Sequence, residues 1–282
     1  MPNIQKIKTN RGESREISLI SLTKVPKKPP EPMSRDEQIS EICRYIKEGW
    51  IRSFKFQWEA TGEYFKEIKP EHLITVNIAH SIVDPSNFGR PFIIKLEEST
   101  NIAFNECFEL MKKVAKTEKF KFIKIDRKFH NSTRNGKFDI VLYAKAINSH
   151  KEHDTRYVIE VKGFNQKRSQ ILRDINRICE LADLVDAVGN SSFIAGFVTF
   201  AKSYKQPLPY DDAKKKHLKK CLDLLSAHDK KNTSVEPIVF EISSHLPTGD
   251  HDIDQGHCFI GTILIIKRNI QTPLGGLEHE KW

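Results

Sequence analysis

Two short apolar stretches, each with one carboxylate inside it, decide how this chain is interpreted. They are FDIVLY at residues 138–143 and YVIEVK at residues 157–162. An apolar stretch of this length is typical of a buried strand. Burying an ionised carboxylate there is costly unless the group is paired or bound to a metal. Two such acids on neighbouring strands therefore predict a divalent cation at Asp139 and Glu160.

The alternation of side chains along a strand extends this prediction. Glu160 and Lys162 are two residues apart, so they point to one face, while Ile159 and Val161 point to the other, into a core. Mg²⁺ prefers oxygen ligands, takes only one or two carboxylates, and completes its shell with water and substrate phosphate. A lysine beside the metal can orient an attacking water or help to deprotonate it. The set is suited to metal-assisted hydrolysis of a phosphodiester.

The succession of Asp139 and then Glu160-Val161-Lys162 resembles the PD-(D/E)XK nuclease superfamily, whose core is that of the restriction endonucleases. The resemblance implies that Asp139 and Glu160 ligate the metal, that the backbone carbonyl of Val161 adds a ligand, and that Lys162 positions the water. Phe138 stands where the family's name-giving proline would be. The resemblance spans about residues 97–204.

Three further site residues are expected from the resemblance. The family often places an acid on the helix that precedes these strands, and Glu106 is the candidate metal ligand here. It also often places polar groups on the helix after the E-x-K strand, which makes Lys167 and Gln170 candidates to support the site. Ordinary helix surface is an equal alternative for those two. A solvent-facing Glu–Lys pair on an antiparallel strand is the structural alternative for the E-V-K itself.

The order of predicted elements fits an α/β fold with a restriction-endonuclease-like core, in which a central mixed sheet is flanked by helices. Periodicity predicts a helix over 101–119, a strand over 120–125, the two strands that carry Asp139 and Glu160, a helix over 166–187 and a strand over 193–200. Residues 145–156 are polar and predict a long hairpin loop. This α-β-β-β-α-β order is the one that the family core would have.

The charge of the chain indicates a nucleic-acid partner. Lys and Arg number 46 against 37 acids, a formal net charge of +9, and residues 111–137 contain ten Lys or Arg and two acids. Such a basic segment next to Asp139 would attract a polyanion and release counterions. A solvated basic surface is the alternative, and charge does not separate DNA from RNA. The candidate nucleic-acid-binding residues are Lys121, Lys124, Arg127, Lys128, Arg134 and Lys137.

Composition predicts four segments. Residues 1–33 are expected to be a flexible, basic, Pro-rich segment, 34–92 an N-terminal helical module or an elaboration packed on the core, 93–270 the nuclease-like domain with further strands near its end, and 271–282 a tail. The further strands are expected over 235–243 and 258–267. A second basic cluster, over 214–220, opens a helix that is expected to end near residue 228.

The 34–92 segment carries helix signals at both ends. Ser34 and Glu37 are spaced as a capping box that opens a helix, and Gly49 is expected to end it. Phe54, Phe56 and Trp58 alternate like a strand, and we expect them in a core or an interface. A second helix is predicted to begin near Pro70.

Several functional classes are excluded by missing motifs. The sequence has no Walker A loop, Rossmann glycine fingerprint or nucleophile elbow, so no bound nucleotide cofactor is expected. No apolar stretch is long enough to cross a membrane and no signal peptide is visible. Five cysteines without paired spacing predict buried free thiols in a reducing cytoplasm.

The sequence thus predicts a cytoplasmic, Mg²⁺-dependent nuclease, with Mn²⁺ as a substitute metal. DNA is favoured over RNA as substrate and an endonuclease over an exonuclease. A role in prokaryotic anti-phage defence is expected, as a homo-oligomer or with a partner protein. The alternative is a non-catalytic module for nucleic-acid binding or protein interaction on a nuclease-like scaffold.

Overall fold

The chain divides into two compact units, Met1–Met33 and Ser34–Trp282. In the first unit, the strands β1 (Gln5–Lys8) and β2 (Ser14–Ile17) pair antiparallel. The computed structural model of the protein describes residues 5–8, 14–17, 34–61, 70–83, 92–100, 102–103, 136–144, 154–186, 193–205, 209–226, 233–243 and 257–268.

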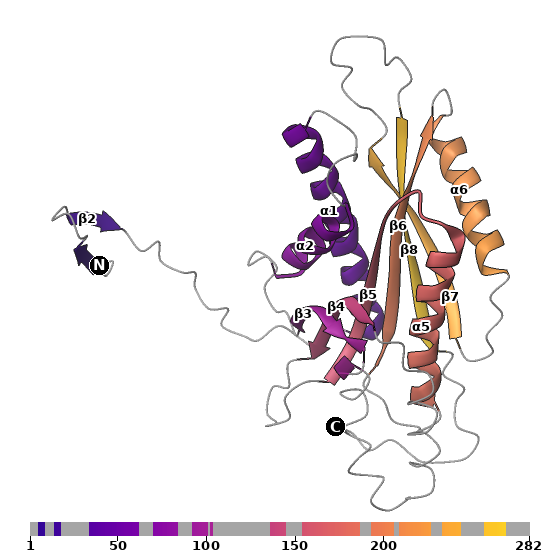
Figure 1. Ribbon diagram of the computed structural model, residues 1–282, viewed down its shortest axis with the longest axis horizontal. Coiled ribbons are helices and arrows are strands. Elements are labelled where there is room, and N and C mark those ends of the chain that lie inside the picture. Colours follow the sequence, from indigo (N-terminus) through magenta and orange to yellow (C-terminus); the bar gives the residue numbers. More distant parts are fainter. Residues whose placement is uncertain are drawn as a thin grey trace, which may run out of the picture. The chain divides into compact units, whose positions relative to one another are not determined.

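The second unit is built on a six-stranded mixed sheet in the order β3-β4-β5-β6-β8-β7 (Figure 1). The strands β5 and β6 are parallel, and the other neighbours are antiparallel. The α/β class predicted from the sequence is therefore confirmed. The strands are β3 (Phe92–Ser99), β4 (Lys137–Ala144), β5 (Asp154–Phe164), β6 (Ala195–Lys205), β7 (Thr233–Ser243) and β8 (His257–Arg268).

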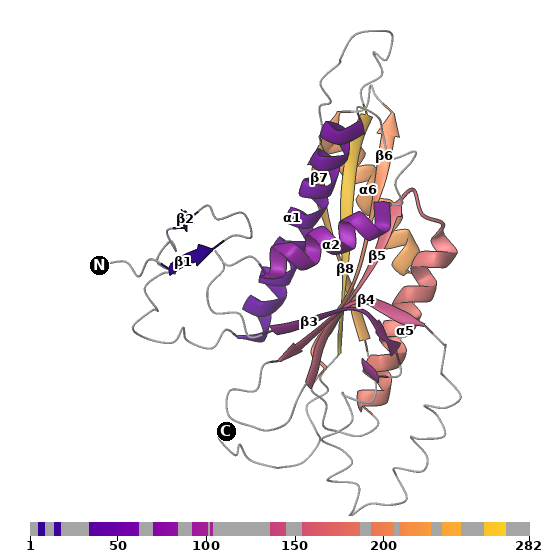
Figure 2. The same ribbon diagram turned by 60° about the vertical axis from the view of Figure 1, so that its left-hand side comes forward.

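Helices cover both faces of this sheet. The helices α1 (Arg35–Thr61) and α2 (Pro70–Val83) lie on one face, and α5 (Arg168–Asp186) and α6 (Tyr210–Leu225) lie on the other (Figures 1 and 2). Each face has its own apolar core. Ile159 of β5 joins the core under α1 and α2, whereas Val158 joins the core under α5. The predicted alternation of side chains along β5 is thus confirmed.

The start of α1 is fixed by the predicted capping box. The Ser34 N–H donates to Glu37 Oε2 at 2.7 Å, and the Glu37 N–H donates to Ser34 Oγ at 3.3 Å. The expected end at Gly49 is wrong, because α1 continues to Thr61. Gly49 lies where α1 meets α2: a Cβ there would be 2.6 Å from the backbone of Ile78. The glycine therefore serves close helix packing.

The aromatic stretch near Trp50 also differs from the prediction. Phe54, Phe56 and Trp58 lie within α1 and not in a strand. Phe54 is buried and packs on Phe259 of β8, whereas Phe56 is exposed. The spacing of two residues therefore places the rings of Phe54 and Phe56 on different sides of one helix, and alternation of aromatics alone was a misleading signal.

The predicted α-β-β-β-α-β order stays a prediction, because residues 104–135, which include most of the predicted helix and all of the strand over 120–125, lie outside the described part. The described elements directly before β4 are α2, β3 and helical residues at 100, 102 and 103. The helices predicted near residue 70 and over 166–187, and the strand over 193–200, are confirmed as α2, α5 and β6. The two late strands are confirmed as β7 and β8.

Candidate active site

The two acids singled out by the sequence meet across the antiparallel pair β4–β5. Ile140 pairs with Ile159 in the register, so the next residues along each strand, Asp139 and Glu160, stand opposite one another. Asp139 Oδ2 accepts a hydrogen bond of 2.7 Å from the Val161 N–H. The structure thus brings Asp139 and Glu160 together at the edge between the sheet and α5.

Lys162 lies on the same face as Glu160, and α5 supplies the partners of both. Lys162 Nζ is 3.3 Å from Asp174 Oδ2, and Arg177 Nη2 is 2.5 Å from Glu160 Oε1. Asp174 and Arg177 are one helical turn apart and are themselves joined at 2.8 Å. The side chains of Glu160 and Asp174 are each only 1% exposed. The site is therefore a buried network of alternating carboxylates and cations.

This network leaves polar atoms without hydrogen bonds. Glu160 Oε1, Asp174 Oδ2 and Arg177 Nε are buried and make no hydrogen bond in the described part of the chain. The short distances from Arg177 to Glu160 and from Lys162 to Asp174 are those of ion pairs, without the angles of hydrogen bonds. Buried polar atoms without a hydrogen bond are rare in protein interiors. Here both carboxylate oxygens have a cation of the protein beside them, Arg177 for Glu160 and Lys162 for Asp174.

Electrostatics at the site raise the pKa values of both carboxyls and of the amine. Burial, reinforced by the nearby Asp139 and Asp174, raises the pKa of Glu160 well above its ordinary value, although Arg177 opposes this. Burial also raises the pKa of Asp139, although the hydrogen bond from the Val161 N–H and the charge of Lys162 lower it in part. For Lys162, burial lowers the pKa, but the surrounding acids, Asp174 first, outweigh it and the net shift is upward.

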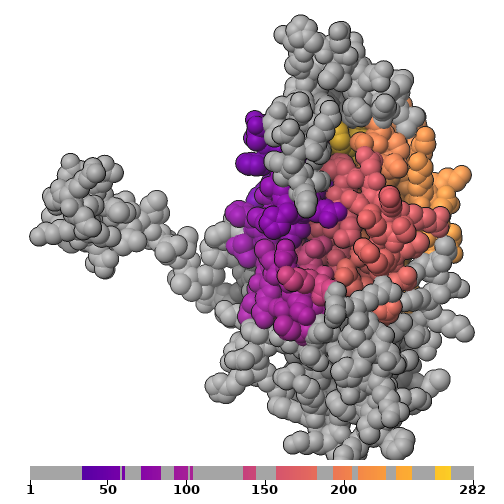
Figure 3. Space-filling view, in the orientation of Figure 1, coloured from indigo at the N-terminus to yellow at the C-terminus, as the bar shows by residue number. Residues whose placement is uncertain are grey.

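A fourth acid, Glu71, reaches the site from α2. The strand β5 has a register shift between Val161 and Phe164, which frees the Gly163 N–H from the ladder. Glu71 Oε1 accepts hydrogen bonds from this N–H at 3.1 Å and from Gln166 Nε2 at 3.0 Å. The Glu71 carboxylate also influences the pKa values of Asp139 and Lys162. In Figure 3 the surface of α1 and α2, indigo to purple, borders the rose-coloured surface of the β5–α5 region.

Four site residues were missed by the sequence reasoning: Glu71, Gln166, Asp174 and Arg177. Glu71 is in the first turn of α2. Acids are common at that position because a negative charge interacts favourably with the positive end of the helix dipole. Asp174 carried a usable signal: it is one residue from Ile175 on the apolar side of a helix, where a lone carboxylate needs a partner. Arg177, one turn later, was the natural candidate for that partner.

The remaining predicted site residues are not joined to the network. Lys167 is exposed and Gln170 is half-buried, and in the described part no hydrogen bond or ion pair links either side chain to Asp139, Glu160 or Lys162. Lys137 is exposed and pairs with Glu97 at 3.2 Å. Other predicted residues lie outside the described part of the chain: Glu106, Lys121, Lys124, Arg127, Lys128 and Arg134.

The oxygen atoms at the site can be set against the ligands that a divalent metal needs. Within the described ranges, no group of three or more acidic, His or Cys side chains is arranged to hold a metal ion. Mg²⁺ needs fewer, because it is bound by one or two carboxylates together with water and substrate phosphates. Asp139, Glu160 and the Val161 carbonyl supply ligands of that number and kind, and Glu160 Oε1 would exchange its contact with Arg177 for the metal.

Comparisons with known proteins give no family for the chain: no protein-family model, no curated protein and no solved structure matches it. Among the described helices, none has both the length and the apolar character needed to cross a lipid bilayer. The four described cysteines, Cys43, Cys179, Cys221 and Cys258, are free and buried.

Proposed function

We propose that the protein is a Mg²⁺-dependent nuclease with a restriction-endonuclease-like core, acting on DNA in preference to RNA. The observation that carries the proposal is the pairing of Asp139 with Glu160 across β4 and β5, with Lys162 on the same face as Glu160. The succession β4-β5-α5-β6 supports it, since the core that the resemblance implies ends in two strands, a helix and a further strand in this order. Mn²⁺ is the expected substitute metal.

The chain's residues divide into ligands and residues that position them. Asp139, Glu160 and the Val161 carbonyl would hold the metal, which when bound stabilises charge on the phosphate and on the leaving oxygen. Arg177 fixes the orientation of Glu160, and Asp174 fixes that of Lys162. Glu71 holds the bulge of β5 in place through the Gly163 N–H.

Lys162 acts on the attacking water. Its amine is charged in this environment, and it lies 3.3 Å from the Val161 carbonyl oxygen, beside the proposed metal ligands. An ammonium donates hydrogen bonds and accepts none, so Lys162 orients the water and stabilises the negative charge that develops as the water loses its proton to solvent. The water oxygen bonds to phosphorus and the bond to the 3′-oxygen breaks. The resemblance implies a 5′-phosphate and a free 3′-hydroxyl.

The test is cleavage of supercoiled plasmid, linear DNA and RNA with Mg²⁺, Mn²⁺ or EDTA. Asp139→Ala, Glu160→Ala and Lys162→Ala should each lower the cleavage rate by at least about a hundredfold. The carboxylate variants should also bind Mn²⁺ more weakly in a calorimetric titration, whereas Lys162→Ala should bind it normally. Nucleic-acid affinity should persist in all three variants, because it depends on the basic surface.

A matched control separates chemistry from folding. Lys215→Ala changes an exposed lysine of α6 and should cleave like the wild type. Circular dichroism and thermal unfolding should show that all variants fold. If Glu160→Ala cleaves as fast as the wild type, the activity does not belong to this site.

The second candidate function is a non-catalytic nucleic-acid-binding scaffold. One observation favours it: Arg177 already neutralises Glu160 at 2.5 Å, as in a purely structural buried ion pair. Under this alternative, the wild-type protein binds nucleic acid but cleaves none with any metal. Arg177→Ala then lowers the stability of the fold and has no other effect.

The proposal also includes a role in defence and an association with a second copy or a partner protein. A phage-infection assay tests the role, and a pull-down tests the association.

A further inference from the structure

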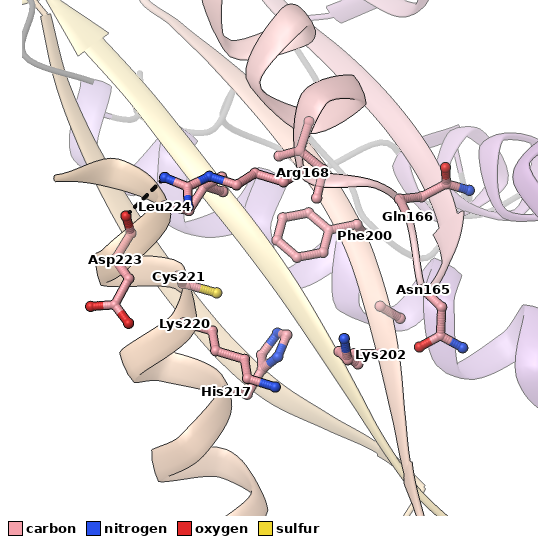
Figure 4. A pocket seen from close by; sticks show the side chains of 12 residues that line it. Asn165, Gln166, Arg168, Phe200, Lys202, His217, Lys220, Cys221, Asp223 and Leu224 are labelled. Atoms are coloured by element: carbon pink, nitrogen blue, oxygen red, sulfur yellow. Dashed lines mark hydrogen bonds between the residues drawn. The ribbon is translucent and has the colours of Figure 1, made fainter. Parts of the chain in front are cut away.

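A pocket of about 350 Å³ lies between the start of α5, the strand β6 and the helix α6 (Figure 4). Its walls are of two kinds. Ile171, Phe200 and Leu224 provide apolar surface, and Arg168, Lys202 and Lys220 provide positive charge. A volume of this order accommodates a small organic ligand. The combination of apolar and cationic walls suits a ligand that is both flat and anionic.

In the described part of the chain, the cations that line the pocket make no ion pair with a carboxylate. Asp223 is the one acid that lines it, and what Arg168 contacts there is the backbone oxygen of Asp223, at 3.2 Å. Within the described residues, no carboxylate lies within ion-pair distance of Lys202 or Lys220. Burial and the neighbouring Lys202 and Lys216 lower the pKa of Lys220, the mark of cations that repel one another. An anion placed between these amines would relieve that repulsion.

His217, also in the pocket wall, contributes no charge of its own. Its ring nitrogens contact the Tyr204 hydroxyl at 2.9 Å and Thr262 Oγ1 at 2.6 Å, and burial lowers its pKa to about 4. It is neutral at pH 7 and fixed in place. The anion-binding groups are therefore the cations Lys202 and Lys220, together with Arg168.

The pocket is linked to the proposed active site through the connection from β5 to α5. Gln166 lines the pocket, and its Nε2 donates to Glu71 Oε1 at the bulge of β5. The neighbouring Asn165 has a positive φ of 54° and is fixed by hydrogen bonds to Ser203 of β6. One short, well-fixed segment thus borders both the carboxylate network and the cationic pocket.

We propose that this pocket binds a single nucleotide of the substrate strand, next to the phosphodiester that is cleaved. Its phosphate lies between Lys202 and Lys220, and its base lies against the apolar wall that includes Phe200. The inference rests on the proposed nuclease function and adds a substrate class to it: a strand with at least one unpaired nucleotide. An apolar wall contacts the face of any base, so the pocket is tolerant of sequence.

The test measures binding without metal, so it does not depend on cleavage. A short fluorescent single-stranded oligonucleotide is titrated in EDTA with the wild type and with Lys202→Ala/Lys220→Ala. The double variant should bind at least about tenfold more weakly, and its salt slope should fall by roughly 0.7, because the one phosphate that both lysines contact is no longer neutralised. Lys215→Ala/Lys219→Ala, which removes two exposed charges from the same helix, should weaken binding by less than about threefold.

Two results would overturn the proposal. Equally weakened binding in the two double variants would show a diffuse basic surface with no special pocket. Tight binding of free deoxynucleoside monophosphate that saturating oligonucleotide does not displace would show an independent small-molecule site. Conversely, a pocket-specific decrease in affinity in a protein that cleaves nothing would keep the nucleotide site and remove the nuclease assignment alone.

Discussion

At the scale of a single residue, the buried carboxyl of Glu160 lowers the stability of the fold. It is buried, it faces Asp139 and Asp174, and its pKa is raised well above 4.5. For a carboxyl with a raised native pKa, the native state binds the proton more tightly than the unfolded chain does. Stability therefore falls as pH rises from about 4.5 through the raised pKa. At neutral pH, without metal, Glu160 works against folding.

Glu160→Gln is accordingly expected to stabilise the metal-free protein. Glutamine resembles the neutral carboxyl that the site prefers, so the melting temperature at pH 8 in EDTA should rise by a few degrees. The gain should disappear toward pH 4, where the wild-type carboxyl is protonated. Glu59→Gln, an exposed change on α1, is the control and should shift the melting temperature by less than about one degree. A lower melting temperature for Glu160→Gln would mean that the Arg177 pair stabilises the fold.

His217 makes the opposite contribution. Its native pKa is about 4, against 6.5 in the unfolded chain, so between these values the unfolded chain binds the extra proton. The stabilisation is complete above pH 6.5 and is lost as pH falls to 4, by about 3 kcal/mol in all. In His217→Gln, which carries no titrating group, this part of the pH dependence should vanish from urea unfolding curves. If the free energy of unfolding of His217→Gln still fell between pH 6.5 and pH 4 as in the wild type, a group other than His217 would bind the proton.

At the scale of elements, close packing fixes α5 over the sheet. Gly196 of β6 lies under Ile178 of α5, and a Cβ at Gly196 would clash with the Ile178 side chain. Because the same helix carries Asp174 and Arg177, its distance from the sheet sets the geometry of the carboxylate network.

Gly196→Ala is expected to lower the free energy of unfolding by about 1–3 kcal/mol, as overpacking does. Cleavage should fall by more than the folded fraction explains, since α5 is displaced from Glu160 and Lys162. Adding Ile178→Ala removes the clashing atoms and should restore part of the activity. Normal activity in Gly196→Ala alone would mean that α5 can shift without disturbing the site.

Sequence patterns predicted the helices and strands around the site better than they predicted which residues make up the site. Strand alternation placed Glu160 and Lys162 on one face, and apolar periodicity located α5, because both signals are local. The hydrogen bond between Glu71 and Gly163 joins residues 92 positions apart, and no local pattern encodes it. The aromatic alternation near Trp50 misled because packing of α1 against the sheet, with Phe54 on Phe259 of β8, decided which rings are buried.

At the scale of the whole molecule, the net charge of +9 predicts salt-dependent binding of a polyanion. The basic segment 111–137 is expected to supply much of it, although most of that segment lies outside the described residues. Replacing Lys121, Lys124 and Lys128 with Glu should weaken DNA binding and reduce the salt slope by roughly 0.9 for each phosphate that is no longer neutralised.

The control for this charge reversal is the replacement of Lys214, Lys215 and Lys219 of α6 with Glu. These lysines are exposed and do not line the pocket, and the net charge changes equally. An equal decrease in affinity for both triple variants would attribute the binding to overall charge. An affinity unchanged by the first triple variant would remove the 111–137 segment from the binding surface.

Trp50 gives the molecule an optical reporter of its own. Its ring is fully buried, its indole N–H donates to Thr199 Oγ1 at 2.7 Å, and it packs edge-to-face on Phe164 at 5.3 Å between ring centroids. Phe164 directly follows Gly163, where Glu71 holds the bulge of β5. Any ligand that moves this bulge must change the packing around the indole. With Trp58 and Trp282 replaced by Phe, emission from Trp50 should therefore follow the loading of the site in real time, without a label, on the timescale of a stopped-flow experiment.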